Sequence, residues 1–353
     1  MQRVPANTMS FTALHCKHCA RALILTSAFV LIVIGITTTK LIMNAANVAI
    51  SSAWICRRNR TATVTQYHSA ESASSSSAVN VVLPDSFHVR NETFNCTQAQ
   101  LIGLTFPICV YTAAADVWIS GVLLRGDYFE REEVSRLMRL LLSDQRLQLV
   151  DIGANIGIYS LPAARLTHVL AVEPNWHSMA RLARAVDRGT VSSNITLVHN
   201  AVSDVRTKLK MGVDPNNQGH AFLINSTKCK STLEWGSACN TLKETTTVIL
   251  NDLLPLMRSN ATLIKVDVEG NERNIFTESS VGEFFDQIDV PLVFMEWERV
   301  KQFSPEIVQP VLDFFRRRNY GAFDTENSIL QQHYRSWPYN ILFKKLSYIN
   351  YRF

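Results

Sequence analysis

The stretch LVDIGANIGIYS, residues 149–160, joins an apolar run to a carboxylate and a set of closely spaced small residues. The apolar run ends at Asp151, and Gly153, Asn155 and Gly157 then occupy every second position. An apolar strand that leads through such a turn into a helix is typical of nucleotide-binding α/β units. The spacing therefore predicts a ligand-binding turn at the end of a buried strand.

Three classes of ligand use turns of this kind, and the glycine spacing separates them. A nicotinamide site needs G-x-G-x-x-G, but Ile158 stands at the third glycine position. A P-loop needs G-K-S/T, which the stretch lacks. The pattern D/E-x-G-x-G-x-G of class I S-adenosylmethionine sites fits, with Asn155 at the middle glycine. Because Asn tolerates left-handed backbone angles better than most residues, the spacing favours S-adenosylmethionine.

Acidic residues at the ends of the predicted strands favour the same ligand. They are Asp151, Glu173, Asp267 with Glu269, and Glu296 with Glu298. The carboxyl ends of such strands face the binding crevice. A carboxylate there would oppose the pyrophosphate of a dinucleotide, whereas S-adenosylmethionine brings an ammonium and a sulfonium group. A chain with a net charge of +5 thus lines its crevice with acids, which suits a cationic cofactor.

Glu173 lies 22 residues after Asp151, and an acid at that spacing holds the ribose hydroxyls of a bound nucleotide. This spacing alone does not separate a nicotinamide cofactor from S-adenosylmethionine.

The surrounding elements alternate between strands and helices. We expect strands at 147–151, 169–173, 195–199, 262–267, 290–296 and 338–345, each an apolar run. We expect helices at 130–143, 158–166, 177–187, 271–278 and 306–318. The polar stretch 204–247 interrupts the rhythm and predicts inserted hairpins and loops. Continuous apolar strands between helices predict an α/β fold with a doubly wound, mostly parallel, Rossmann-like sheet.

Four segments in order carry a resemblance to a known family. They are VDIGANIGIYS, VLAVEPN, NITLVHNAVSD and LIKVDVEGNERNIF. Together they resemble the FkbM-type methyltransferases over roughly 116–345. Those proteins are class I S-adenosylmethionine-dependent enzymes that typically methylate hydroxyls of sugars and natural products. The resemblance implies the same fold, cofactor and type of reaction here.

The resemblance also implies cofactor contacts for the matched residues. Asp151, Gly153, Asn155 and Gly157 would cradle the methionine part. Glu173 would hold the ribose. The segment 201–204, which ends at Asp204, would lie against the adenine.

Asp267, Glu269 and Gly270 match the family's DVEG segment at the crevice floor, and Asn271 stands where the family often has a small residue. A sugar hydroxyl is a poor nucleophile, so methyl transfer requires a base or a metal. We expect Asp267 to lie nearest the transferred methyl group and Glu269 to orient the acceptor hydroxyl. In an extended segment their side chains would point to opposite faces, whereas a turn at Gly270 would bring both inward.

Two alternatives for catalysis stay open. Asp267 and Glu296 would share a divalent cation, as acids at these strand ends do in catechol O-methyltransferases, although we do not favour a metal. His199 and His220 are alternative bases.

At the level of function, the alternatives are a membrane-anchored binding protein of the same fold without turnover, and a nicotinamide-dependent oxidoreductase. We expect no nucleic-acid partner, because no long basic run is interleaved with aromatic residues.

The region before the domain predicts a membrane anchor. Residues 22–39 are eighteen residues without a charge, which as a helix span about 27 Å of a bilayer core of about 30 Å. We therefore divide the chain into a tail at 1–21, a transmembrane signal-anchor at 22–39, and a juxtamembrane and Ser-rich stem at 40–100. The methyltransferase domain follows at 101–353, with the insert at 204–247.

The charges that flank the anchor are nearly balanced, so other features must set its orientation. Four cysteines follow residue 90, an even number that permits two disulfides, although free buried thiols are almost as good an interpretation; they are Cys96, Cys109, Cys229 and Cys239. Six N-x-S/T sequons follow the anchor, at Asn59, Asn91, Asn95, Asn194, Asn225 and Asn260. These features favour a type II glycoprotein with its domain in the lumen of the endoplasmic reticulum or Golgi, acting on a glycan or small-molecule acceptor.

Overall fold

A computed structural model describes residues 79–84, 94–214, 217–224, 240–348 and 353. These residues all belong to one unit, Ala73–Phe353. The predicted tail, the anchor at 22–39, most of the stem, and Cys229 and Cys239 lie outside the described residues. Within the described part of the chain, no helix is both long enough and apolar enough to cross a membrane.

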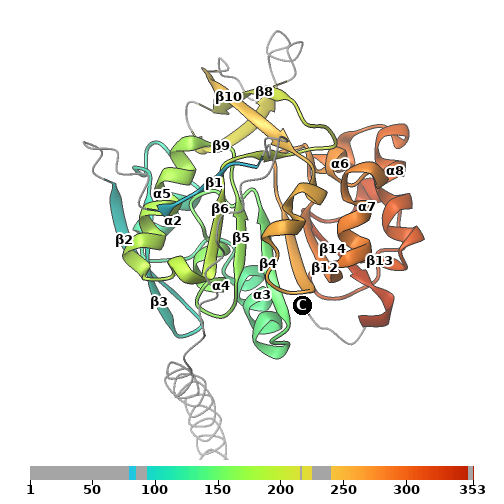
Figure 1. Ribbon diagram of the computed structural model, residues 1–353, viewed down its shortest axis with the longest axis horizontal. Helices are drawn as coiled ribbons and strands as arrows, with labels where there is room; N and C mark the ends of the chain where they lie inside the picture. Colours follow the sequence, from blue (N-terminus) through green and yellow to red (C-terminus); the bar gives the residue numbers. More distant parts are fainter. Residues whose placement is uncertain (1–78, 85–93, 215–216, 225–239, 349–352) are drawn as a thin grey trace, which may run out of the picture. The chain divides into compact units, whose positions relative to one another are not determined.

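An eight-stranded sheet forms the centre of the described unit, in the order β1-β6-β5-β4-β11-β12-β14-β13 (Figure 1). Its strands are β1 (Val81–Val82), β4 (Leu147–Ile152), β5 (Val169–Val172), β6 (Ile195–Val198), β11 (Ala261–Val266), β12 (Asp289–Glu296), β13 (Tyr320–Phe323) and β14 (Asn340–Lys345). The five strands from β6 to β12 run parallel, whereas β1 and β14 pair antiparallel with their neighbours in this block. The predicted doubly wound, mostly parallel sheet is therefore confirmed.

Helices cover both faces of the sheet. Successive residues of each central strand face opposite sides, and both faces are apolar. Leu149 of β4 packs in one apolar cluster and Val150 in the other. The first cluster includes residues of α3 (Arg131–Ser143), α4 (Ser160–Ala163) and α5 (Trp176–Gly189), and the second includes residues of α6 (Glu272–Ile275), α7 (Glu278–Gln287) and α8 (Pro305–Arg317). Every residue of β4 and of β11 is buried, as parallel strands between two helical layers require.

The order of the strands creates a crevice at the centre of the sheet. From β4 the chain moves outward through β5 and β6, and it then returns to build β11 and β12 on the other side of β4. The segments that follow β4 and β11 therefore diverge at the carboxyl ends of two adjacent strands. Ligands bind at such switch points in open α/β sheets.

The polar insert folds into a small sheet above these strand ends (Figure 1). Its strands are β7 (Ala201–Val202), β8 (Lys208–Asp214), β9 (Asn217–Ile224) and β10 (Asn240–Val248), in the order β7-β10-β8-β9. The predicted hairpin is the antiparallel β8–β9 pair, and β10 pairs with the other side of β8. We refer to β7–β10 as the cap sheet.

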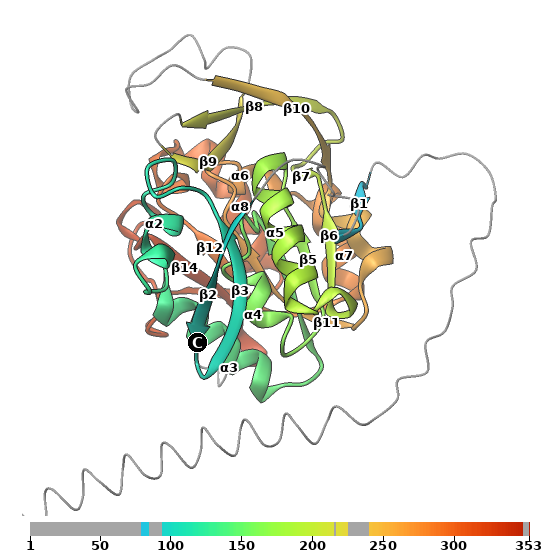
Figure 2. The same ribbon diagram turned by 90° about the vertical axis from the view of Figure 1, so that its left-hand side faces the viewer.

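The folded unit begins before the predicted domain start at 101. β1 pairs with β6, and β2 (Asn95–Leu101) pairs with β3 (Leu104–Val110) in an antiparallel hairpin. A disulfide joins Cys96 of β2 to Cys109 of β3, which stand opposite each other in the pairing. In Figure 2 this hairpin lies beside α4 and α5, and a short helix, α2 (Ile119–Leu124), follows it. The predicted boundary at 101 between stem and domain therefore falls inside the folded unit, at the end of β2.

Two predicted helices are shorter than expected. The helix predicted at 158–166 is α4 alone, because Arg165 and Leu166 donate to residues three positions back and tighten the chain into a turn. Of the helix predicted at 271–278, only Glu272–Ile275 forms α6, because Thr277 adopts an extended conformation. Thr277 then caps α7, which begins at Glu278 and was not predicted, through its hydrogen bonds with Ser280. β13, which pairs with β14 at the edge of the main sheet, was not predicted.

Candidate active site

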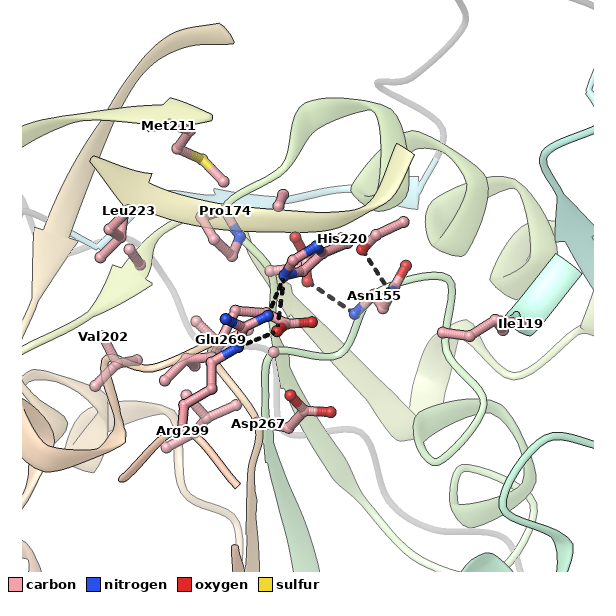
Figure 3. Close-up of a pocket in the computed structure, with 18 of the residues that line it drawn as sticks. Ile119, Asn155, Pro174, Val202, Met211, His220, Leu223, Asp267, Glu269 and Arg299 are labelled. Atoms are coloured by element: carbon pink, nitrogen blue, oxygen red, sulfur yellow. Dashed lines mark hydrogen bonds and ion pairs between the residues drawn. The ribbon is translucent and has the colours of Figure 1, made fainter. Parts of the chain in front are cut away.

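A cavity of about 480 Å³ lies at the carboxyl ends of β4, β5, β6 and β11, beneath the cap sheet (Figure 3). Its walls include Gly153 after β4, Glu173 after β5, and Asp267 and Glu269 after β11. The cap sheet contributes His220. A cavity of this volume suits a small-molecule ligand, since such sites typically have about 300–1,000 Å³.

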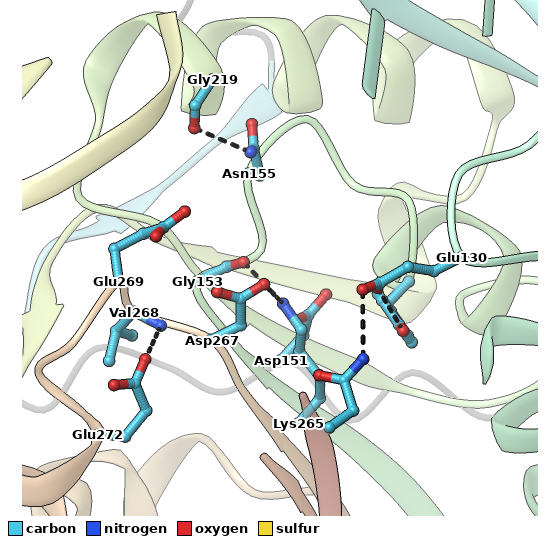
Figure 4. A network of polar contacts seen from close by, with 12 residues as sticks. Glu130, Asp151, Gly153, Asn155, Gly219, Lys265, Asp267, Val268, Glu269 and Glu272 are labelled. Atoms are coloured by element: carbon cyan, nitrogen blue, oxygen red, sulfur yellow. Dashed lines mark hydrogen bonds and ion pairs between the residues drawn. The ribbon is translucent and has the colours of Figure 1, made fainter. Parts of the chain in front are cut away.

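The predicted binding turn has the backbone that its sequence requires. Gly153, Asn155 and Gly157 have φ angles of 84°, 50° and 96°, so the left-handed conformation expected of Asn155 is confirmed. The Asn155 side chain donates a hydrogen bond from Nδ2 to the Gly219 carbonyl of the cap sheet at 3.1 Å, as Figure 4 shows. A glycine at position 155 would adopt the same backbone but would not make this bond to the cap.

Glu173 closes the turn from the neighbouring strand. Its Oε2 accepts the backbone N–H of Asn155 at 2.8 Å, and its Oε1 accepts the backbone N–H of Asn175 at 2.7 Å. Burial raises the pKa of Glu173 to about 7, although both hydrogen bonds favour the carboxylate. The side chain is 5% exposed and lines the cavity, a position from which it would reach a ligand's hydroxyls.

Three of the predicted cofactor residues do not line the cavity. Asp151 is fully buried, where its Oδ2 accepts a hydrogen bond from Ser160 Oγ at 2.6 Å and its Oδ1 lies 3.7 Å from Lys265 Nζ. A Cβ on Gly157 would lie 2.5 Å from Leu182 Cδ1, so this glycine allows the turn to pack on α5. The direct cofactor contacts of Asp151 and Gly157 stay predictions.

The third of these residues is Asp204, whose Oδ1 accepts a hydrogen bond from Ser203 Oγ at 3.0 Å. The predicted adenine segment 201–204 thus reaches the cavity only at its start. Asn200, Ala201 and Val202 line the cavity there. The direct contact of Asp204 with the cofactor stays a prediction.

Both predicted catalytic acids line the cavity. Glu269 and Gly270 have φ angles of 56° and 96°, so the chain turns directly after Asp267 and Val268 instead of remaining extended. This turn brings both acids to the cavity, as expected for a turn at Gly270. Their environments differ, because Asp267 Oδ2 lies 3.3 Å from Lys265 Nζ, whereas Glu269 Oε2 lies 3.0 Å from Arg299 Nε.

Lys265 is a site residue that the sequence analysis missed. It lies on β11, is 4% exposed, and donates from Nζ to the Gly153 carbonyl at 3.2 Å. Burial alone would lower the pKa of Lys265, but Asp267, Asp151 and Glu130 outweigh burial and raise the pKa above its usual value. A lysine in the apolar run TLIKVD was the one sequence feature that could have revealed it.

Glu130 is a second missed residue. Its Oε2 accepts a hydrogen bond from the Tyr159 hydroxyl at 2.7 Å, and its Oε1 lies 3.4 Å from Asn340 Nδ2. Burial, followed by repulsion from Asp267, raises the pKa of Glu130. It lines the cavity, yet in the sequence FEREEV nothing distinguishes it from the exposed Glu132.

The two candidate histidines differ in position. His220 lines the cavity, and its Nε2 lies 2.9 Å from Glu269 Oε2 and 2.8 Å from Arg299 Nη2 (Figure 3). His199 donates from Nε2 to the Pro174 carbonyl at 3.1 Å, and burial lowers its pKa. His199 is not among the residues that line the cavity, which leaves His220 as the histidine placed to act there.

Residues 151–321 match the family model described as Methyltransferase FkbM domain. The chain carries an FkbM methyltransferase domain. This match agrees with the four segments that suggested the family. The match and the left-handed turn together assign S-adenosylmethionine as the cofactor, as the glycine spacing predicted. None of the curated proteins matches the chain.

Solved structures of methyltransferases are similar to the chain at low identity. A precorrin-6y C5,15-methyltransferase from Geobacter metallireducens GS-15 has 12% identity and a TM-score of 0.31, over 61% of this chain and 89% of that one. An O-methyltransferase described as putative, from Klebsiella pneumoniae, has 15% identity and a TM-score of 0.33, over 62% of this chain and 81% of that one. A 16S rRNA N2 G1207 methyltransferase from T. thermophilus, in complex with AdoMet and guanosine, has 13% identity and a TM-score of 0.33, over 72% of this chain and 51% of that one.

The residues around the FkbM domain's cavity fit S-adenosylmethionine in their chemistry. Glu173 presents a carboxylate that suits a ribose diol, and the apolar side chains of Ala201 and Val202 suit the face of a purine. Asp267 and Glu269 supply negative charge on the same walls, which suits an ammonium and a sulfonium group. The expected absence of a nucleic-acid partner stays an expectation.

Proposed function

We propose that this protein transfers the methyl group of S-adenosylmethionine to a hydroxyl of a glycan or another small acceptor. The observation that carries the proposal is the placement of Glu173 and Asp267 on the walls of one cavity. Glu173 follows β5 and would hold the cofactor's ribose. Asp267 follows β11, on the other side of β4 from β5, and would face the reacting hydroxyl.

Asp267 is the proposed base. S-adenosylmethionine supplies an electrophilic methyl group on its sulfonium. As the acceptor oxygen bonds to the methyl carbon and the carbon–sulfur bond breaks, the Asp267 carboxylate would take the hydroxyl proton. Its side chain is 37% exposed, so an acceptor can reach it. Lys265, which bonds both the Gly153 carbonyl and Asp267, would hold the base in register with the cofactor turn.

Glu269 is the proposed orienting residue. Arg299 and His220 contact its Oε2, and these contacts fix the direction of the carboxylate at the cavity wall. A carboxylate held in this way can accept a hydrogen bond from a second hydroxyl of the acceptor. Glycans offer neighbouring hydroxyls, and this supports a glycan or another polyol as the acceptor.

We also propose that the domain acts in the lumen of the endoplasmic reticulum or Golgi, behind a signal-anchor at residues 22–39. Three sequon asparagines fall in the described part of the chain, Asn95, Asn194 and Asn260, and all are exposed. The Cys96–Cys109 disulfide suits an oxidising compartment. These features support the proposed location independently of the reaction.

The test is methyl transfer by the full chain, purified in detergent, with radiolabelled S-adenosylmethionine and a panel of glycans. We expect label in a glycan fraction and no label with Asp267→Asn. Binding of the cofactor without turnover on any acceptor would favour the non-catalytic binding protein. Binding of NADH instead of S-adenosylmethionine would favour the oxidoreductase.

A further inference from the structure

Three carboxylates from separate elements converge beside the cavity. They belong to Asp267 after β11, Glu272 at the start of α6, and Glu296 at the end of β12. One oxygen atom from each lies within 4.8 Å of the corresponding atoms of the other two. This separation allows a single ion to contact all three carboxylates, because cation–oxygen distances in proteins are about 2.0–2.6 Å.

Two of these carboxylates have a buried oxygen without a hydrogen-bond partner. Glu272 is fully buried, and its Oε1 accepts the backbone N–H groups of Val268 at 2.8 Å and of Gly270 at 3.3 Å. Its Oε2 has no partner among the described residues, and the same is true of Oε2 of Glu296, which is 5% exposed. A buried carboxylate oxygen without a partner is costly.

The charges around this cluster are unbalanced. Burial, together with the neighbouring acids, raises the pKa of Glu296 to about 10 and of Glu272 to about 7. Three cations of the described chain lie near the cluster: Lys265 pairs with Asp267 itself and with Asp151, Arg299 pairs with Glu269, and Arg273 donates to the Gly270 carbonyl. Among the ion pairs of the described residues, none involves Glu272 or Glu296. A bound cation would satisfy both orphan oxygens and remove the repulsion among the acids.

We propose that Asp267, Glu272 and Glu296 bind one divalent cation, of the hard, oxygen-preferring class to which Mg²⁺ and Mn²⁺ belong. All three ligands are carboxylates, which these ions prefer to the nitrogen and sulfur ligands that favour Zn²⁺. Three protein ligands leave positions for water or for oxygen atoms of a bound molecule. Figure 4 shows Glu272 and Asp267 on either side of the Val268 backbone, with Asp267 toward the cavity.

The ion would lie where the acceptor is proposed to bind. Since Asp267 both lines the cavity and belongs to the cluster, an open coordination position at the ion would be available to an acceptor hydroxyl. A metal-bound hydroxyl has a lower pKa, so the ion would take over the task of activating the nucleophile. This consequence rests on the proposed function, whereas ion binding itself requires neither cofactor nor acceptor.

The test is direct ion binding by the full chain after treatment with chelator and dialysis. We titrate MnCl₂ alone and follow the loss of the free-Mn²⁺ electron paramagnetic resonance signal. We expect saturation at one ion per chain, competition by Mg²⁺, and at least tenfold weaker binding in Glu272→Gln and in Glu296→Gln. Glu298→Gln removes an acid that follows the same strand as Glu296 but lies outside the cluster and pairs with Lys301, and it should bind Mn²⁺ within about threefold of the parent.

Two outcomes would overturn the proposal: no saturable binding at millimolar Mn²⁺, or unchanged affinity in both glutamine variants. Circular dichroism shows whether each variant folds. If neither variant folds, crystals of the unaltered chain are soaked in Mn²⁺ instead. An anomalous-scattering peak among these three carboxylates supports the proposal, and a peak only elsewhere or no peak overturns it. Ion binding is measured without S-adenosylmethionine or acceptor, so a failure of methyl transfer would not be confused with a failure here.

Discussion

Gly153 and Asp267 approach so closely that a Cβ on Gly153 would lie 1.7 Å from the Asp267 carbonyl oxygen. The two residues follow adjacent parallel strands, and the Asp267 N–H donates to the Ile152 carbonyl at 3.0 Å. The turn that is proposed to hold the cofactor and the acid that is proposed to face the acceptor are thus packed backbone to backbone. Any side chain at position 153 would separate them.

Gly153→Ala should therefore destabilise the domain and abolish cofactor binding. The backbone at 153 has a φ of 84°, and the added methyl group has no room. We expect a loss of about 3 kcal/mol or more in the free energy of unfolding, from overpacking added to left-handed strain. Chemical denaturation and calorimetry with S-adenosylhomocysteine measure the two effects.

Gly126→Ala is the matched control for this substitution. Gly126 has the same φ of 84°, but nothing lies within 4 Å of its Cβ position. It should lose only the conformational part, about 1–2 kcal/mol, and it should bind the cofactor normally. Equal losses in the two variants would show that the close approach at Asp267 is not what requires Gly153.

Glu173 should make cofactor affinity depend on pH near neutrality. Its pKa of about 7, raised by burial, means that it is protonated below pH 7 and ionised above. Ribose hydroxyls donate more strongly to a carboxylate than to a carboxylic acid. Affinity for S-adenosylhomocysteine should therefore rise as the pH increases from 6 to 8, by about tenfold, the difference between a charged and a neutral hydrogen bond.

Glu173→Gln has no titrating group at this position. In calorimetry across the same pH range, this variant should bind more weakly and should lose most of the pH dependence. A pH profile that is the same in the variant would assign the titration to another group, such as Glu272, whose pKa is also raised to about 7 by burial.

The sequence predicted the parts of this site that depend on local spacing. The turn at Gly153, Asn155 and Gly157 follows from the backbone angles that these residues permit, and the buried strands follow from continuous apolar runs. The convergence of Asp267 and Glu296 followed in outline from the rule that carboxyl ends of parallel strands share one edge. None of these inferences required knowledge of how distant segments pack.

Residues that depend on packing between distant segments were missed. Glu130 begins a surface helix, and only the fold of the preceding loop, with a φ of 51° at Glu130, directs its side chain to Tyr159. Arg299 follows β12 and meets His220 of the cap sheet, although no sequence pattern links the two. Glu272 was hidden because an acid in the first turn of a helix is common on protein surfaces.

Asn155 should anchor the cap sheet as well as shape the turn. Asn155→Gly keeps the left-handed backbone but removes two hydrogen bonds, one from Nδ2 to the Gly219 carbonyl of the cap sheet and one from Ser178 Oγ of α5 to Oδ1, of which only the first reaches β9. Amide hydrogen exchange across β9 should then become faster, by about five- to tenfold for the loss of one hydrogen bond of about 1 kcal/mol. Mass spectrometry of the β9 peptide measures the change.

Asn319→Gly serves as the control for Asn155→Gly. Asn319 also has a left-handed backbone, with a φ of 61°, but it lies before β13 at the far edge of the main sheet. Its replacement should leave exchange in β9 unchanged. Unaltered exchange in Asn155→Gly as well would mean that the other contacts of the cap hold it without Asn155.

The protein should lose mass on treatment with N-glycosidase when it is made in animal cells. The exposed sequons at Asn95, Asn194 and Asn260 motivate this expectation, and each carries Thr at its third position. Substituting all three asparagines by Gln should reduce the shift in gel mobility. An unchanged mobility of the parent, together with a C-terminus that protease reaches in sealed microsomes, would contradict the lumenal location.

Asp267→Asn and Glu269→Gln should reduce turnover for different reasons. Asp267→Asn removes the proposed base, and the loss of a positioned base costs about 10²–10⁴-fold in rate. Glu269→Gln removes a carboxylate that pairs with Arg299 and His220, so it should raise KM for the acceptor as well as lower kcat. Cofactor affinity should stay within a few-fold in both variants, because Glu173 and the turn are unchanged.

Chelator and added Mg²⁺ separate the two tasks that Asp267 could perform. If Asp267 acts only as a base, chelator leaves the parent's turnover unchanged and Asp267→Asn is slow at every Mg²⁺ concentration. If Asp267 acts as an ion ligand, chelator abolishes the parent's activity, Mg²⁺ restores it, and Glu272→Gln needs more Mg²⁺ for the same rate. Turnover that survives both Asp267→Asn and Glu269→Gln would place catalysis elsewhere, and His220 would then be the next residue to replace, since it lines the same cavity.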